Sequence, residues 1–169
     1  MRVEFLRFIS AWGEPIAPVT VADSYFEEYA DLLPETMLDL WREIGFAGFG
    51  DGLLWICDPH TWQPIVNTWL DGLDIPEPYT GTQIPIFRTA YGDIYCFKPG
   101  LGQTLTVAPA VSMILLSSPI PILTTEWLDR EMEAFLELPR RMFTQTSTYM
   151  PGTDEPFQEN MFERIVGDR

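Results

Sequence analysis

The segment 84–97, IPIFRTAYGDIYCF, indicates how this chain folds. Ile84 to Thr89 and Ile94 to Phe97 are rich in β-branched and aromatic residues, which favour strands. Gly92 lies between them and supplies the backbone geometry of a hairpin turn. Pro85 places the first strand at a sheet edge or at its own start, because proline donates no ladder hydrogen bond. We therefore predict an antiparallel β-hairpin in the middle of the fold.

Apolar runs on both sides of this hairpin predict further strands. Leu53 to Cys57 is apolar throughout, as expected of a buried strand. Gln103 to Ala108 and Ala110 to Leu116 predict one or two more strands, divided by a proline. The segments 46–52 and 72–82 are rich in glycine or proline and predict loops.

Two amphipathic helices are predicted before the strands, roughly over 21–33 and 34–44, because apolar residues recur there at i, i+3, i+4 and i+7. Gly45 is placed to end the second helix in a left-handed cap. The first twenty residues contain scattered glycine and proline. We expect them to form a short entry segment and a loop.

Helical patterns return after the first strand and again after the sheet. Pro64 interrupts the hydrogen bonds of a helix, so a short turn and then a helix from about Gln63 are expected. A further helix is predicted over 126–138, then a loop over 144–155 and a last helix near 156–166. The whole indicates an α+β fold over 1–169 as a single domain: N-terminal helices, a central and mainly antiparallel sheet, and C-terminal helices.

Composition limits the possible functions. The chain has 169 residues, of which 46% are apolar, so it can bury a core without metal or disulfide. Its net charge of −15 argues against direct binding of nucleic acid and against anionic membranes, and favours a basic protein partner. Cys57 and Cys96 lie in apolar runs and are expected to be buried thiols. We find no membrane span and no secretory signal, which makes the cytoplasm the simplest location.

Signals of catalysis or metal binding are weak. His60 is the single histidine, and no Cys/His cluster has zinc-ligand spacing. Gly48, Gly50 and Gly52 lack the lysine of a phosphate-binding loop and are interpreted as turn glycines. We therefore predict no catalytic residues, no metal and no cofactor. A small hydrolase using Asp51 and Asp58 stays open as an alternative.

Acidic residues recur along the first two helices at intervals of four. Residues four apart lie on the same side of a helix, where like charges repel each other. Arg42 is the one cation close to them in the sequence. This pattern is typical of a solvated helix face, or of an electronegative docking surface for a basic protein. The candidate partner-binding residues, called the acidic stripe below, are Glu27, Glu28, Asp31, Glu35, Asp39 and Glu43.

Several short motifs resemble the GAD-like domain family over roughly 24–107. They are Tyr29-x-x-Leu32-Leu33-Pro34, Leu38-x-x-Trp41-x-x-x-Gly45-Phe46, Gly52-Leu53-Leu54-Trp55-Ile56-x-x-Pro59, Trp69-Leu70 and Arg88-Thr89-Ala90-Tyr91-Gly92-Asp93-Ile94-Tyr95. The resemblance implies a GAD-like core over 1–100 and the beginning of the family's C-terminal immunity region over 101–169. Because the chain stops at Arg169, that second lobe is expected to be missing, or the chain to be a shorter branch.

The resemblance also implies a function. Family members are often fused to, or continuous with, immunity proteins of type VI secretion, antidotes to interbacterial toxins that include DNA-degrading ones. We therefore expect a non-enzymatic immunity protein whose partner is a cognate toxin with a basic surface. The alternative is an adaptor that binds a peptide or small molecule through its tryptophans, although their helical or strand spacing favours positions in the core. They are Trp12, Trp41, Trp55, Trp62, Trp69 and Trp127.

Overall fold

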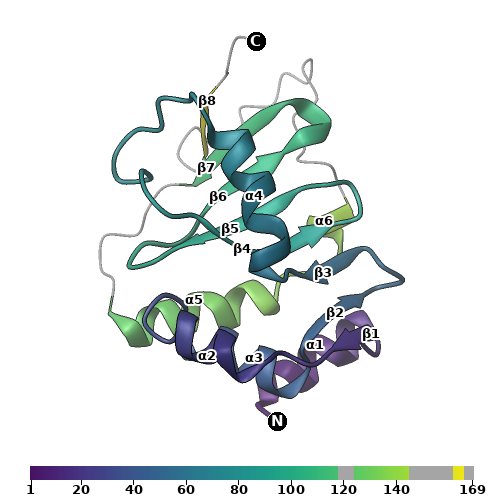
Figure 1. Ribbon diagram of the computed structural model, residues 1–169. Helices are drawn as coiled ribbons and strands as arrows, with labels where there is room; N and C mark the ends of the chain where they lie inside the picture. The colour runs from purple at the N-terminus through teal and green to yellow at the C-terminus, as the bar shows by residue number, and fades with distance from the viewer. Residues whose placement is uncertain (118–123, 145–161, 166–169) are drawn as a thin grey trace.

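The computed structural model describes residues 1–117, 124–144 and 162–165. Its centre is an eight-stranded sheet whose spatial order follows the chain, with every neighbouring pair antiparallel. The strands are β1 (Ile16–Val19), β2 (Phe46–Phe49), β3 (Leu54–Ile56), β4 (Ile84–Thr89), β5 (Ile94–Lys98), β6 (Gly102–Ala108), β7 (Met113–Ser117) and β8 (Phe162–Ile165). The helices are α1 (Val3–Trp12), α2 (Asp23–Tyr29), α3 (Glu35–Glu43), α4 (Pro59–Leu70), α5 (Thr125–Leu136) and α6 (Arg141–Thr144), with a 3₁₀ turn at Pro109–Val111. The predicted α+β class is confirmed (Figure 1).

The hairpin from which the prediction started is present as β4 and β5. Arg88 pairs with Ile94, and Gly92 takes a left-handed φ of 93° in the turn, as expected. Along β5, alternate residues join two different apolar clusters. Tyr95 and Phe97 pack with the cluster under the N-terminal helices, whereas Ile94 and Cys96 pack with the cluster under α4. Because a strand alternates sides, helices cover both faces of the sheet.

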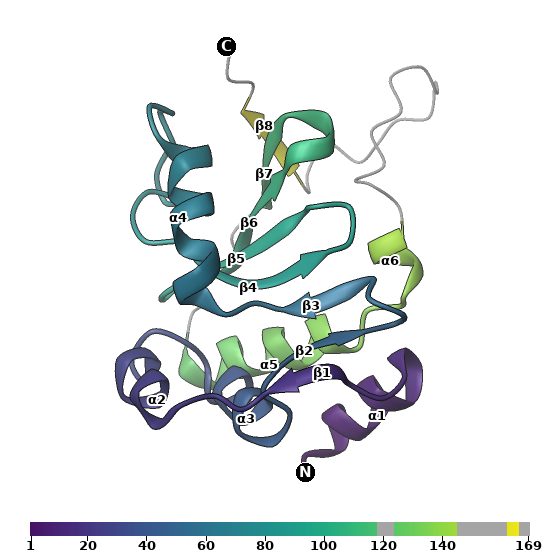
Figure 2. The ribbon, with the colours of Figure 1, turned by 45° about the vertical axis from the view of Figure 1, so that its right-hand side comes forward.

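The larger cluster holds the N-terminal helices and α5 on one face. Figure 2 shows α1, α2, α3 and α5 together below the sheet, while α4 stands on the other side. Phe5, Phe8 and Trp12 of α1 are buried against this face, and α5 packs against both α1 and α3. Within the described residues, no helix is both long enough and apolar enough to cross a bilayer.

The first fifty residues correct the prediction at three places. Residues 3–12 form α1 and residues 16–19 form β1, where an entry segment and a loop were expected. Residues 46–49 form β2 rather than a loop. Gly48 lies inside that strand opposite Trp55, and glycine suits this position because an added Cβ would come within 2.8 Å of the Trp55 ring. Short strands such as these are stabilised by their neighbours in the sheet more than by their own composition.

Helix α4 runs unbroken from Pro59 to Leu70, so the expected break at Pro64 is wrong. The Asp58 side chain caps the helix by accepting a hydrogen bond from the backbone N–H of His60. Val66, fully buried, fixes the helix on the sheet. These contributions offset the single helical hydrogen bond that Pro64 cannot donate.

The C-terminal predictions are confirmed in part. Helix α5 covers 125–136, close to the predicted 126–138. The last predicted helix, 156–166, is wrong over 162–165, where the backbone pairs with β7 as an antiparallel strand. A strand edge attracts a partner through backbone groups, and side-chain periodicity does not report this. Residues 156–161 and 166 lie outside the described residues, as does the predicted loop apart from Thr144, which ends α6.

Candidate functional site

The acidic stripe lies on neighbouring helices of the lower layer, α2 and α3 (Figure 1). Its members are solvent-exposed except Asp39, which is half-buried. Helix α2 ends at Tyr29 and α3 begins at Glu35, so Asp31 lies in the turn between them. The stripe is therefore two short segments joined by a turn.

Cations compensate most of the α3 segment. Arg42 forms ion pairs with Glu35 at 2.6 Å and with Asp39 at 2.8 Å. Asp39 also accepts from the Arg2 guanidinium at 2.6 Å, and the N-terminal amine lies 3.3 Å from Glu43. The sequence separation of 37 residues between Arg2 and Asp39 explains why local reasoning found Arg42 alone.

The α2 segment keeps more of its negative charge. Glu28 contacts the Nε2 atom of His60 at 2.9 Å, a pair that is ionic only when the histidine is protonated. Within the described residues, neither Glu27 nor Asp31 forms an ion pair or a side-chain hydrogen bond. The structure thus concentrates the uncompensated negative potential of the stripe at α2 and the turn after it.

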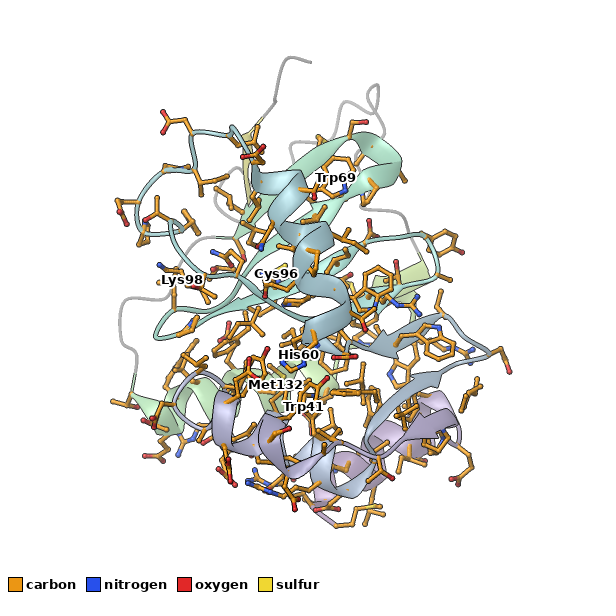
Figure 3. The ribbon with its side chains drawn as sticks, viewed as in Figure 1. Trp41, His60, Trp69, Cys96, Lys98 and Met132 are labelled. Atoms are coloured by element: carbon orange, nitrogen blue, oxygen red, sulfur yellow. The ribbon has the colours of Figure 1, made fainter. Side chains whose placement is uncertain are left out.

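Aromatic rings hold α2 in place. Figure 3 shows His60 at the lower end of α4 with Trp41 beneath it. The Tyr25 ring lies 4.3 Å from the His60 ring, and Tyr29 lies 5.5 Å from the Trp41 ring between centroids. The Tyr25 hydroxyl donates to Asp58 at 2.9 Å, and burial together with this carboxylate raises the pKa of Tyr25 to about 12. The phenol therefore stays a neutral donor, and α2 is tied to the start of α4.

A groove runs beside this charged segment. It has a volume of about 520 Å³ and lies between α2, α4 and the loop before β4. Its lining combines Glu28 and Tyr29 from α2 with polar side chains of α4, Gln63 and Asn67. Apolar side chains, among them Leu70 of α4, also line the groove, so it offers both apolar and polar contacts to a ligand.

The residues considered for catalysis have structural contacts instead of a common site. Asp58 accepts hydrogen bonds from Tyr25, from Thr61 and from a backbone N–H in the first turn of α4. Asp51, fully exposed at the other end of β3, lies 3.4 Å from Arg140. In the described part of the chain, no group of three His, Cys, Asp or Glu side chains is arranged to hold a metal ion.

Both cysteines are buried free thiols, as predicted. Burial raises the pKa of Cys57 and of Cys96 well above the usual thiol value. A thiol that resists ionisation is a poor nucleophile.

The tryptophans divide into two groups. Trp12 and Trp41 are buried in the core, as predicted. Trp55, Trp62, Trp69 and Trp127 are half-buried, so their assignment to the core is only partly right.

Comparison with known proteins supports the fold. A family model described as the GAD-like domain matches residues 3–111. The crystal structure of Atu4351 from Agrobacterium tumefaciens superposes with a TM-score of 0.66 at 19% identity, covering 78% of this chain. This chain spans 58% of the length of that structure. A search of curated proteins found no match.

Proposed function

This chain belongs to the GAD-like domain family, and on that premise we propose that it is an immunity protein that binds and neutralises a cognate secreted toxin. The toxin is expected to present a basic surface, and nucleases are one class that would do so. The proposed mechanism is occlusion in the cytoplasm: an acidic surface on a rigid scaffold covers a cationic site of the toxin and performs no chemistry.

The observation that carries this proposal is the uneven compensation of the acidic stripe. Glu27 and Asp31 lack cationic partners among the described residues, whereas Asp39 is shared by Arg2 and Arg42. Surface charges of one sign steer an oppositely charged partner and raise its association rate. Because α2 is anchored through Tyr25 and Tyr29, these carboxylates are held in position before the partner arrives.

A second candidate function rests on the groove between α2 and α4. Its volume of about 520 Å³ and its lining of both polar and apolar side chains favour an adaptor that holds a peptide segment. An adaptor would bind through the groove floor and would depend little on Glu27, which is not among the groove residues.

Co-expression with the protein encoded by the neighbouring gene tests the immunity role. We expect survival of the host cell and a stable complex on a sizing column. Continued killing, together with the absence of a complex, would contradict the proposal.

Charge reversal tests the surface. Glu27→Lys and Asp31→Lys should each slow association several-fold at low salt and weaken its salt dependence. Glu14→Lys is the matched control, because it changes the net charge equally from an exposed position between α1 and β1, away from α2 in both views (Figures 1 and 2). Equal effects at all three positions would mean that net charge matters and that α2 is not the contact surface.

A further inference from the structure

Among the arginines whose side chains the structure describes, Arg88 differs from the others in its surroundings. The guanidinium carbon of Arg88 lies 5.0 Å from the ring centre of Trp55 and 4.6 Å from that of Trp62. All three side chains are half-buried. Two indoles therefore contact one cation on the sheet face that carries α4.

The sheet register builds this arrangement. Gly48, Trp55 and Arg88 pair side by side across β2, β3 and β4, so they share one face. Gly48 leaves room for the Trp55 indole, whose Nε1–H donates to the Gly52 carbonyl at 2.8 Å. Trp62 comes from the first turns of α4. Arg88 and the two indoles that contact it, Trp55 and Trp62, are called the clamp below. Strand pairing, the hydrogen bond of the Trp55 indole and the position of α4 together fix their arrangement.

Within the part of the chain that the structure describes, the hydrogen-bonding edge of Arg88 forms no ion pair with a carboxylate. Other arginines with described side chains each form an ion pair with a carboxylate; these are Arg2, Arg7, Arg42, Arg130 and Arg140. Arg42 and Arg140 also lie over aromatic rings, so ring contact alone does not prevent pairing. Among the described side chains, no carboxylate forms an ion pair with Arg88, whose guanidinium contacts the two indoles. In a chain with 25 acidic residues, an arginine without a described carboxylate partner is unusual, and its N–H groups are available to a ligand.

We propose that Arg88, clamped between Trp55 and Trp62, binds a carboxylate side chain of a partner protein. Indoles that contact the guanidinium favour an approach by its edge, where N–H groups form a fork that matches the two oxygens of a carboxylate. None of the three clamp residues lines the groove between α2 and α4, so the clamp is separate from that groove. Tryptophan and arginine are also the residues most enriched where binding energy concentrates in interfaces.

The proposal does not depend on the immunity role, since any protein partner could provide the carboxylate. If both surfaces engage one partner, that partner presents basic groups to α2 and an acidic group to the clamp. Two contacts of opposite sign would then define its orientation.

The test uses a small probe, N-acetylglutamate α-amide, with N-acetylglutamine α-amide as its neutral isostere. The arginine Nε–Hε signals of the full-length protein are followed by NMR at constant ionic strength, and Arg88→Lys assigns the Arg88 signal. We expect a saturable shift of the Arg88 signal with the glutamate probe alone, with a Kd on the order of 10 mM for one charge-assisted pair. The Arg42 signal serves as the internal control, because Glu35 and Asp39 already occupy that guanidinium.

Variants and a competing anion complete the test. Trp62→Leu should weaken binding of the glutamate probe by roughly two- to five-fold while the protein stays folded, because the guanidinium is then held on one side only and has to be ordered when the probe binds. Equal shifts with both probes, or equal shifts of the Arg88 and Arg42 signals, would overturn the proposal. Tighter saturation by inorganic phosphate would overturn the assignment to a carboxylate and identify a phosphate site instead.

Discussion

At the scale of single residues, a carboxylate from a distant helix caps α3. The backbone N–H of Thr36, in the first turn of α3, donates to Asp129 Oδ1 of α5 at 2.8 Å. This bond satisfies one donor that a helix start leaves free, and it joins two helices of the lower layer. Because the cap is supplied by α5, no signal for it exists near residue 36.

We predict that Asp129→Ala lowers the free energy of unfolding by about 0.5–2 kcal/mol, the usual range for loss of an N-cap. Urea denaturation measures the loss. Glu126→Ala is the matched control on the same helix, since its exposed pair with Arg130 should contribute at most about 0.5 kcal/mol. Equal losses of unfolding free energy in the two variants would show that the hydrogen bond from Thr36 to Asp129 stabilises the protein no more than an exposed ion pair does.

Asp93 provides a prediction about pH. Its side chain is buried in the β4–β5 turn, with Oδ1 unpartnered, and burial raises its pKa although the hydrogen bond with Thr89 opposes the rise. The native state then holds this proton more tightly than the unfolded chain does. Its contribution to stability is therefore lost as pH rises from the unfolded pKa, about 3.9, through the native value.

Asp93→Asn should accordingly gain stability relative to the wild type as the pH is raised from acid to neutral. Urea denaturation of both proteins at several pH values measures the difference in unfolding free energy. A difference that stays constant across this range would show that Asp93 titrates alike in the folded and unfolded chains.

The sequence predicted which acidic residues form the stripe, but it did not predict which cations neutralise them. The four-residue spacing placed the carboxylates on two consecutive helices, and the structure has them on α2 and α3 except Asp31, which lies in the turn between these helices. The pairing of Glu28 with His60 spans 32 residues and that of Asp39 with Arg2 spans 37, and both depend on how helices pack. The Arg88 clamp similarly needs the register of three strands and a helix, which no spacing along the chain reveals.

At the scale of elements, Gly45 controls the passage from α3 to β2. Its φ is +83°, and an added Cβ would meet the Val19 carbonyl oxygen at 2.3 Å. Gly72 after α4 has a similar φ of +72° but open space around it. An alanine at Gly72 would therefore meet only the cost of the left-handed backbone, whereas an alanine at Gly45 would also clash with Val19.

We predict that Gly45→Ala destabilises the protein clearly more than Gly72→Ala, which should cost only about 1 kcal/mol for a left-handed alanine. Thermal unfolding of both variants makes the comparison. Similar melting temperatures would mean that β1 moves away from α3 at little cost.

The predictability of the elements follows how locally each is determined. Helix α3 and the β4–β5 hairpin contain their own periodicity and turn residues, and both were predicted within a residue or two. Helix α1 has a detectable signal, because Phe5, Phe8 and Trp12 follow helical spacing, but the nearby glycine and prolines favoured a loop. Strands β1, β2 and β8 are four residues long each, and their partners in the sheet decide their structure.

At the scale of the whole molecule, the two cysteines report on global opening. Cys57 and Cys96 are fully buried in the sheet region, and burial raises both thiol pKa values. A disulfide reagent in solution therefore needs the fold to open before it can react. We predict slow labelling in buffer and fast labelling in denaturant, followed by absorbance of the released thiolate.

If opening is global, the logarithm of the labelling rate in buffer should increase in Gly45→Ala in proportion to the loss of unfolding free energy, roughly tenfold for each 1.4 kcal/mol. Fast labelling of the wild type would contradict this and would show that one face of the sheet opens locally.

The strand order of the sheet has a consequence for how the protein is made. Each strand from β2 to β7 pairs with the strand that precedes it in the sequence. During synthesis on the ribosome, each of these strands can therefore pair as soon as it emerges. The last row is different, because β8 returns to β7 only after α5 and α6 have emerged. A nascent chain released before residue 162 would carry a bare β7 edge, the surface through which unfinished sheets adhere to one another.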